Sequence, residues 1–196
     1  MLRGGVLSFE EPGSPLIQAS QAGKLMKHKN PDEGSFTFLL VEDDPAHAEL
    51  VKRGFQEHGG AYKIIHLSDG EAALDYLFRR GLYADEHRSP RPHVVLLDLR
   101  LPRKSGFDVL EEVKAEPTLR DIPIVVLTTS QAREDAVRAY HLHANSFVVK
   151  PADFSKFSAL VKELGQYWLR WNFCVKQPKA RSSARPFRVK SPAFGL

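Results

Sequence analysis

The stretch between residues 36 and 172 repeats one pattern, in which a short and almost continuous apolar run is followed by an amphipathic segment. Apolar runs of this kind are typical of parallel strands buried on both faces, and amphipathic segments are typical of the helices that cover them. The predicted strands are 36–41, 62–67, 93–98, 123–128 and 145–150. The alternation predicts an α/β fold, a doubly wound (βα)5 arrangement around a five-stranded parallel sheet.

Capping residues indicate where the helices between these strands begin. The expected starts are Asp44 with Pro45 for the first helix, a capping box of Ser68 and Glu71 for the second, Ser105 for the third, Arg133 for the fourth and Asp153 for the fifth. The fourth helix is expected to bury Ala136, Val137 and Tyr140. The fifth is expected to bury one stripe, made of Phe157, Leu160, Val161, Leu164 and Trp168. Residues 79–91 exceed a minimal connection, which indicates a surface insertion or a prolonged second helix.

The two ends of the chain differ from this middle region in composition. Residues 1–35 contain four basic and four acidic residues together with a PGSP sequence, and we expect a disordered N-terminal extension. Residues 173–196 carry six basic residues, no acidic residue and several prolines, so we expect a basic, disordered tail. The net charge of +4 therefore comes from the tail, and residues 36–172 are expected to form one domain that is mildly acidic.

The cysteine content and the hydropathy of the sequence indicate where in the cell the protein is located. The single cysteine, Cys174, excludes an internal disulfide, and without a CxxC pair there is no zinc or dithiol motif. Apolar runs such as 94–97 are far shorter than the roughly 18–20 residues of a membrane span. The acidic residues near the start do not fit a secretory signal. We therefore expect a cytoplasmic protein that does not enter membranes.

Polar residues gather where the predicted strands end. Glu42, Asp43 and Asp44 follow the first strand, Asp98 ends the third, Thr128 the fourth and Lys150 the fifth. Ligands of a doubly wound sheet bind in the crevice beyond the carboxyl ends of its strands, so these groups are expected to converge. Several acids in one crevice resist ionising together unless a cation neutralises them, and their hard oxygen atoms suit Mg²⁺. We expect Asp44 to serve chiefly as the helix cap.

Four motifs together resemble the receiver domain of two-component response regulators. They are EDD at 42–44, LLDLRLPRKSG at 96–106, VLTTS at 126–130 and SFVVKP at 146–151. Within that family, residues 36–172 look most like the single-domain regulators paired with phytochrome histidine kinases. The resemblance implies a flavodoxin-like fold and a signalling protein, which catalyses only its own phosphoryl transfer and dephosphorylation.

The resemblance also implies a role for each matching residue. Asp98 would accept a phosphoryl group from a phosphohistidine of a sensor histidine kinase, and the resemblance to phytochrome-partner regulators implies that this kinase is a phytochrome. Mg²⁺ would be held by Glu42, Asp43, the Asp98 carboxylate and the backbone carbonyl of Arg100. Thr128 would donate its hydroxyl to the phosphoryl oxygens and Lys150 would pair with them.

Two further features are implied by the same resemblance. The ring of Phe147 would turn inward on activation, and the peptide bond between Lys150 and Pro151 would be cis. Arg100 and Ser130 stand two residues after Asp98 and Thr128, at positions that tune phosphoryl hydrolysis in the family. His143 replaces a small residue before the last strand, and both it and His141 are expected to be structural or surface residues rather than metal ligands.

Other functions fit the residues less well. An aspartyl-phosphate phosphatase would need a second acid at the position of Arg100. Flavodoxin-type FMN binding does not fit, because the acidic loop after the first strand would repel the phosphate of FMN. The glycine motifs of nucleotide-binding and dinucleotide-binding proteins are absent from the sequence. The alternative that stays open is a phosphorylation-regulated nucleic-acid binder acting through the basic tail.

The end of the fifth helix predicts a contact surface. Trp168 continues the buried stripe, whereas Tyr167 and Trp171, four residues apart, form a second patch beside it. Exposed aromatic pairs are often interaction surfaces. We expect a homodimer that uses the fourth helix, the last strand and the fifth helix.

Overall fold

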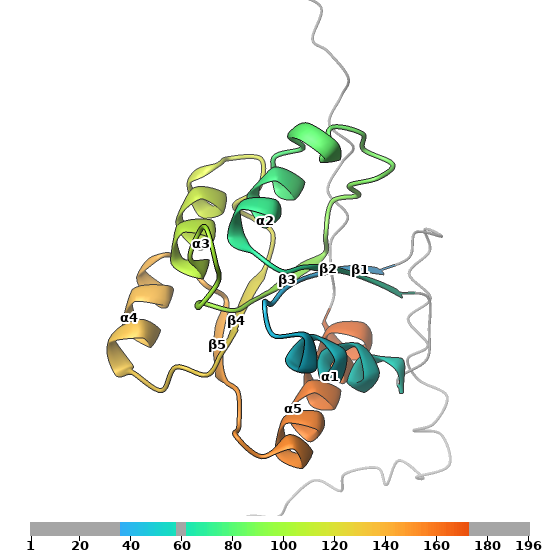
Figure 1. Cartoon of the computed structure of the whole chain (residues 1–196), viewed down its shortest axis with the longest axis vertical. Coiled ribbons are helices and arrows are strands. Elements are labelled where there is room, and N and C mark those ends of the chain that lie inside the picture. The colour runs from blue at the N-terminus through green and yellow to red at the C-terminus, as the bar shows by residue number, and fades with distance from the viewer. Residues whose placement is uncertain (1–35, 58–61, 173–196) are drawn as a thin grey trace, which may run out of the picture.

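The computed structural model describes residues 36–57 and 62–172, and its sheet has five parallel strands in the order β2-β1-β3-β4-β5 (Figure 1). The strands are β1 (Phe36–Val41), β2 (Tyr62–Leu67), β3 (Val94–Leu97), β4 (Ile124–Thr128) and β5 (Ser146–Val149). The helices are α1 (Pro45–Gln56), α2 (Gly70–Leu77), α3 (Gly106–Ala115), α4 (Arg133–His141) and α5 (Phe154–Gln166), with a 3₁₀-helix η1 (Gly81–Tyr83) and a π-helix η2 (Tyr167–Trp171). This is the predicted flavodoxin-like fold.

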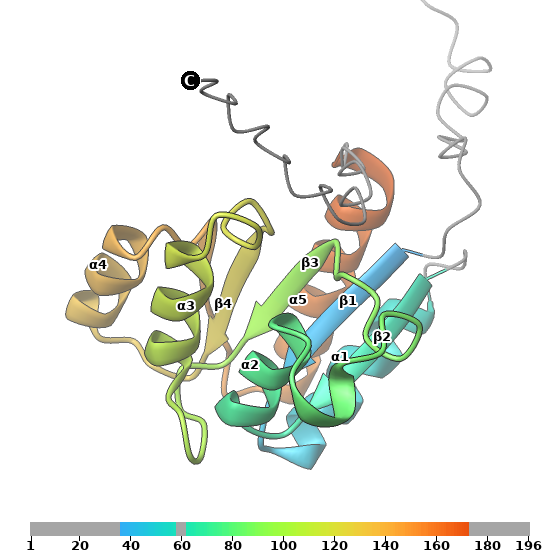
Figure 2. The same cartoon turned by 90° about the horizontal axis from the view of Figure 1, so that it is seen from above.

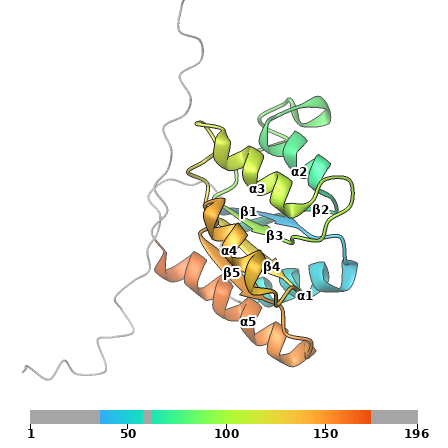
Figure 3. The same ribbon diagram turned by 90° about the vertical axis from the view of Figure 1, so that its left-hand side faces the viewer.

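Two layers of helices cover the sheet, which explains why its central strands are apolar throughout. All four residues of β3 are buried, as are five of the six in β1. Figure 2 shows that the strands run in one direction, and Figure 3 shows α2 and α3 on one face of the sheet with α1 and α5 on the other. Side chains of the central strands therefore pack against helices on whichever face they lie, whereas the edge strands β2 and β5 stay partly exposed.

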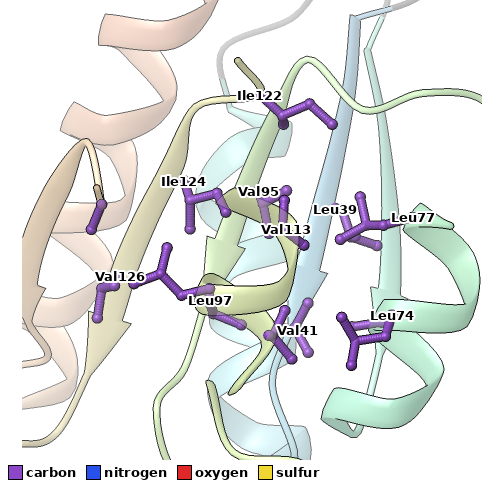
Figure 4. Packing of buried hydrophobic residues seen from close by; sticks show 14 of the residues in the cluster. Leu39, Val41, Leu74, Leu77, Val95, Leu97, Val113, Ile122, Ile124 and Val126 are labelled. Atoms are coloured by element: carbon purple, nitrogen blue, oxygen red, sulfur yellow. The ribbon is translucent and has the colours of Figure 1, made fainter. Parts of the chain in front are cut away.

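Each layer has its own hydrophobic core. One core joins α2, α3 and Ala139 of α4 to the sheet through residues such as Leu39, Val95 and Leu97. Figure 4 shows these side chains filling the space between the strands and the helices α2 and α3. The other core joins α1 and α5 to the opposite face and contains Phe55 and Val161. Alternate residues of one strand thus stabilise two different layers.

The predicted caps hold at three helices, and the cap predicted for α2 is wrong. Asp44 accepts hydrogen bonds from the backbone of Ala46 and His47, and Ser105 forms a full capping box with Asp108. Asp153 likewise accepts from Lys156 N. In α2, however, Asp69 rather than Ser68 accepts the hydrogen bond from Ala72 N at 2.8 Å. Aspartate is an equally good cap, and here its side chain is also buried.

The predicted buried face of α4 is also wrong. Val137 and Tyr140 are 45% and 53% exposed, and the one fully buried residue of this helix is Ala139. Ala136, Ala139 and Leu142 form a competing stripe of small and apolar residues, three apart, and this stripe is the more covered of the two. The larger apolar side chains of α4 consequently face outward.

Residues 79–91 form a surface insertion and not a longer α2, which ends at Leu77. The insertion contains η1 and is held by its own hydrogen bonds. The hydroxyl of buried Ser89 donates to Tyr83 O at 2.5 Å, and that of Tyr76 donates to Pro90 O at 2.6 Å. Within the described ranges, no helix is long and apolar enough to cross a membrane.

The contact between α1 and α5 gives a first prediction. A Cβ atom added to Gly54 would lie 2.6 Å from Cγ1 of the buried Val161. We expect Gly54→Ala to lower the free energy of unfolding by roughly 1–3 kcal/mol through overpacking, although alanine favours a helix by about 1 kcal/mol over glycine. Urea unfolding measures the change.

The matched control shortens the side chain of Val161, which the added Cβ atom would meet. In a Val161→Ala background the same Gly54→Ala substitution should be neutral or stabilising, because the interfering methyl group is gone. Equal destabilisation in both backgrounds would show that the close approach of the helices is not responsible.

Candidate functional site

The predicted polar cluster lies at the carboxyl ends of the strands, where the hydrogen-bond ladder of the sheet positions its backbone. Glu42 N donates to Leu67 O at 3.0 Å, Asp98 N donates to Val41 O at 3.0 Å, and Lys150 N donates to Thr128 O at 2.7 Å. Glu42 and Asp98 follow β1 and β3, the neighbouring strands at which the chain order of the sheet reverses. Doubly wound folds open their ligand crevice at this switch point.

Lys150 joins the two buried acids. Its Nζ atom lies 2.5 Å from Glu42 Oε2 and 2.7 Å from Asp98 Oδ2. All three side chains are nearly inaccessible, with exposed fractions of 1%, 1% and 6% for Lys150, Glu42 and Asp98. Ion pairs buried this deeply persist only when each charge has a partner, so the lysine holds both carboxylates in place.

One carboxylate oxygen in this cluster lacks a hydrogen bond. Glu42 Oε1 is buried and has no hydrogen-bond partner among the described residues, and His47 Nδ1 lies 3.4 Å from it. Burial raises the pKa of Glu42, and the neighbouring Asp98 carboxylate raises it further, whereas Lys150 opposes both effects. The free oxygen can therefore accept a further cationic ligand.

The acidic residues are arranged as a metal site would require. Glu42, Asp43 and Asp98 each offer a carboxylate oxygen, and these three oxygens lie within 4.8 Å of one another. Asp43 is exposed, so the cluster is open to solvent on its side. Three carboxylates against one ammonium leave a formal charge of −2 when all are ionised, which a divalent cation would neutralise. The residues present thus fit a hard divalent ion.

The backbone of the loop after Asp98 folds tightly around the acid. Arg100 N donates to Asp98 Oδ1 at 3.2 Å, and Gly106 N donates to Leu99 O at 2.9 Å. A Cβ atom on Gly106 would lie only 2.1 Å from Asp98 O, so this position requires glycine. The side chain of Arg100 itself is exposed.

Thr128 ends β4, which pairs with β3, the strand that leads to Asp98, and Ser130 follows two residues later. Thr128 is fully buried, and its Oγ1 accepts a hydrogen bond from Ser130 N at 3.3 Å. The Ser130 hydroxyl donates to Asp135 Oδ2 at 2.5 Å and is thereby bound to the first turn of α4. Ser130 therefore connects the strand end to α4.

Phe147 lies on β5, where it packs partly buried against the core that includes α4. Its backbone N–H donates to the hydroxyl of Tyr140 at 3.3 Å.

The predicted cis bond between Lys150 and Pro151 is wrong, because the described residues contain no cis peptide bond. The trans form is the lower in energy for most X–Pro bonds. Of the two roles expected for His141 and His143, structural or surface, their exposed side chains fit the second.

Sequence reasoning missed two residues near the site. His47, three residues into α1, points its ring toward Glu42 and packs edge-on against Phe157 at 5.5 Å between ring centres. Arg103, in the loop after Asp98, forms an ion pair with Asp69 at the start of α2. The position of His47 in the first turn of α1, five residues after Glu42, is only a weak indication that the two side chains meet. No local pattern indicates the partner of Arg103, because Asp69 is 34 residues away in the chain.

A family model described as "Response regulator receiver domain" matches residues 38–162. The probable methanogenesis regulatory protein FilR2 of Methanothrix harundinacea is 48% identical over 140 residues, which cover 71% of this chain and 88% of FilR2. Response regulator Rcp1 of Synechocystis is 40% identical over 131 residues, which cover 67% of this chain and 87% of Rcp1.

Two solved structures have the same fold. The Mn²⁺-bound form of Rcp1 has a TM-score of 0.68 at 37% identity and covers 71% of this chain and 99% of its own. The phosphorylated cyanobacterial phytochrome response regulator RcpA has a TM-score of 0.66 at 37% identity and covers 69% of this chain and 95% of its own. The match to the family model, which covers more than half of the sequence, and these relatives show that the chain belongs to the response regulator receiver domain family.

Proposed function

We propose that this chain is a single-domain response regulator that accepts a phosphoryl group on Asp98 and passes the signal on by protein contact. The proposed receiver domain is 36–172, flanked by an extension at 1–35 and a basic tail at 173–196. The observation that carries the proposal is the position of Asp98, which is held by Lys150 at 2.7 Å within a cluster of three carboxylates.

The reaction follows from the groups around Asp98. A carboxylate oxygen of Asp98 attacks phosphorus, the bond from phosphorus to the donor imidazole nitrogen breaks, and the imidazole leaves with its electron pair. Lys150 is close enough to transfer its hydrogen bond from Asp98 to a phosphoryl oxygen. Thr128, the last residue of β4 next to β3, is proposed to donate its hydroxyl to another phosphoryl oxygen.

We propose Mg²⁺ as the metal, held by Glu42, Asp43, the Asp98 carboxylate and the Arg100 carbonyl. When bound, it would stabilise the negative charge on the phosphoryl oxygens during transfer. The hard oxygen ligands support this choice, and the Mn²⁺-bound form of Rcp1 shows a divalent ion in a relative. The aromatic ring of Phe147 is proposed to turn inward on phosphorylation.

The proposed donor is a sensor histidine kinase, and specifically a phytochrome. Support comes from RcpA, which is described as a phytochrome response regulator and resembles this chain in sequence and fold. A cytoplasmic location stays a prediction. The alternative of nucleic-acid binding rests on residues 173–196, which lie outside the described ranges and beyond the family match at 38–162, so neither the fold nor the relatives support it.

The assignment of Asp98 is tested by removing its nucleophile. Asp98→Asn keeps the shape of the side chain, and we expect labelling by a kinase phosphohistidine or by acetyl phosphate in the presence of Mg²⁺ to disappear. Asp44→Asn is the matched control, because asparagine caps a helix as well as aspartate does. Full labelling of the folded Asp98→Asn protein would refute the assignment.

The metal proposal predicts stabilisation by Mg²⁺ before any phosphorylation. At a concentration 100 times the dissociation constant, Mg²⁺ should raise the free energy of unfolding by roughly 2.7 kcal/mol. The double variant Glu42→Gln, Asp43→Asn should lose the rise in melting temperature, whereas Asp44→Asn should keep it. If the double variant responds like the wild type, the metal binds elsewhere.

We also propose a homodimer formed through α4, β5 and the helix formed by α5 with η2. Tyr167 and Trp171 are 50% and 65% exposed, while Trp168 between them is buried, as the helical spacing predicted. Val137 and Tyr140 add exposed apolar area on α4. Aromatic side chains exposed in this way bury a large area at small entropic cost when a partner covers them.

The dimer proposal predicts a change of mass with concentration. Light scattering from low to high micromolar concentration should show a dimer, and Tyr167→Ala with Trp171→Ala should disperse it. Leu82→Ala is a control, because Leu82 is 86% exposed but lies in η1 outside the proposed face. A wild-type monomer throughout the series, with and without phosphorylation, would rule out the dimer.

A further inference from the structure

The loop at residues 99–105, between β3 and α3, packs tightly against the start of α2. Gly70 N donates to Pro102 O at 3.5 Å, which joins the first residue of α2 to the loop. A Cβ atom on Gly70 would lie 2.1 Å from Lys104 O, so the two backbones touch. Since the obstacle is backbone, it cannot move aside as a side chain would.

Arg103 completes this contact with an ion pair. Its Nη2 atom donates to Asp69 Oδ2, and its Nε atom lies 3.6 Å from Glu71 Oε2. The Asp69 side chain is only 7% exposed, and its other oxygen caps α2 through Ala72 N. One carboxylate thus begins the helix and binds the loop. The hydrogen bond to Asp69 raises the pKa of Arg103.

Arg103 has an unfavourable backbone conformation. Its φ angle is 64°, in the left-handed region that residues other than glycine, asparagine and aspartate rarely adopt. Such a conformation persists where the surroundings enforce it, and here the side chain of Arg103 is bound to the buried Asp69. Non-glycine residues held in this way are often found at functional sites.

The loop at residues 99–105 also contacts the proposed phosphoacceptor, Asp98. Its Arg100 N–H binds Asp98 Oδ1, and its carbonyl is the one proposed to hold the metal. At the other end Gly106 N is bound to Leu99 O, so the loop is fixed next to Asp98. Between these points, the contacts of Pro102, Arg103 and Lys104 with α2 decide where the loop lies.

We propose that Arg103 is a positioning residue, whose ion pair with Asp69 clasps the loop to α2 and so sets the Arg100 carbonyl for the metal. This inference rests on the proposed function, because the clasp acts through the metal site. Neither Arg103 nor Asp69 touches the metal or the phosphoryl group. Their substitution therefore changes the metal affinity by displacing the loop.

The chain offers a matched control for the clasp. Arg79 also has a positive φ angle, 55°, and also forms an ion pair, with its Nη2 atom 3.1 Å from Glu86 Oε1. It lies after α2 in the surface insertion, away from the loop at 99–105. Asparagine tolerates left-handed conformations, so Arg103→Asn and Arg79→Asn each remove an ion pair with little backbone cost.

Isothermal titration calorimetry with Mg²⁺ tests the proposal on the full-length chain. We expect the dissociation constant to rise roughly tenfold in Arg103→Asn, as for residues that orient metal ligands, and to stay unchanged in Arg79→Asn. Asp69→Asn, which keeps the cap, should weaken binding as much as Arg103→Asn. The double variant should be no weaker than either single one, because both remove the same ion pair. Hydrogen exchange should become faster in residues 99–105 and not in α5.

The possible failures are distinguishable. If the wild type binds Mg²⁺ and Arg103→Asn binds it equally well, the clasp is wrong while the acceptor site stands. If the double variant shows the sum of two independent losses, the two residues do not act as a pair and the clasp is again wrong. If the wild type binds no Mg²⁺, the metal proposal fails and the role of Arg103 fails with it.

Discussion

The contact on which this structure depends is the bridge from Lys150 to the carboxylates of Glu42 and Asp98. Its three members follow β5, β1 and β3, and β4 lies between β5 and β3. The long lysine side chain reaches the acids only because these parallel strands end at one level. Charges buried to this degree are costly unless paired, so loss of one member leaves the others uncompensated. The bridge therefore couples the register of the sheet to the chemistry at its edge.

The helices contribute unequally to this edge. His47 of α1 lies between Glu42 and the helix cap Asp44, while the start of α2 holds the loop after Asp98. In contrast, α4 buries only Ala139 completely and is connected to the site through the bond between Ser130 and Asp135. An element with few buried contacts is the easiest to displace. A change at Thr128 could thus reach the exposed apolar side chains of α4.

Local sequence predicted most of the architecture because each element carries its own signal. The five strands lie within one residue of their expected limits, since a strand of a covered parallel sheet is a short and almost continuous apolar run. The convergence of the acids with Thr128 and Lys150 followed from the same rule, because carboxyl ends of parallel strands share one edge. The errors at Ser68 and at the face of α4 arose where two local choices were nearly equal and packing selected between them. The cis bond expected before Pro151 came from the family resemblance and not from a local signal.

The sequence by itself determined the order of strands and helices, the polar set at the strand ends and the family to which the chain is similar. Only the tertiary structure decided which of these groups touch. Whether Lys150 binds one acid or two, and which oxygen of Glu42 stays free, depends on spacing between strands that are far apart in the chain. The pairing of Arg103 with Asp69 likewise joins residues with no common local pattern, because it exists only once α2 and the loop after β3 pack against each other.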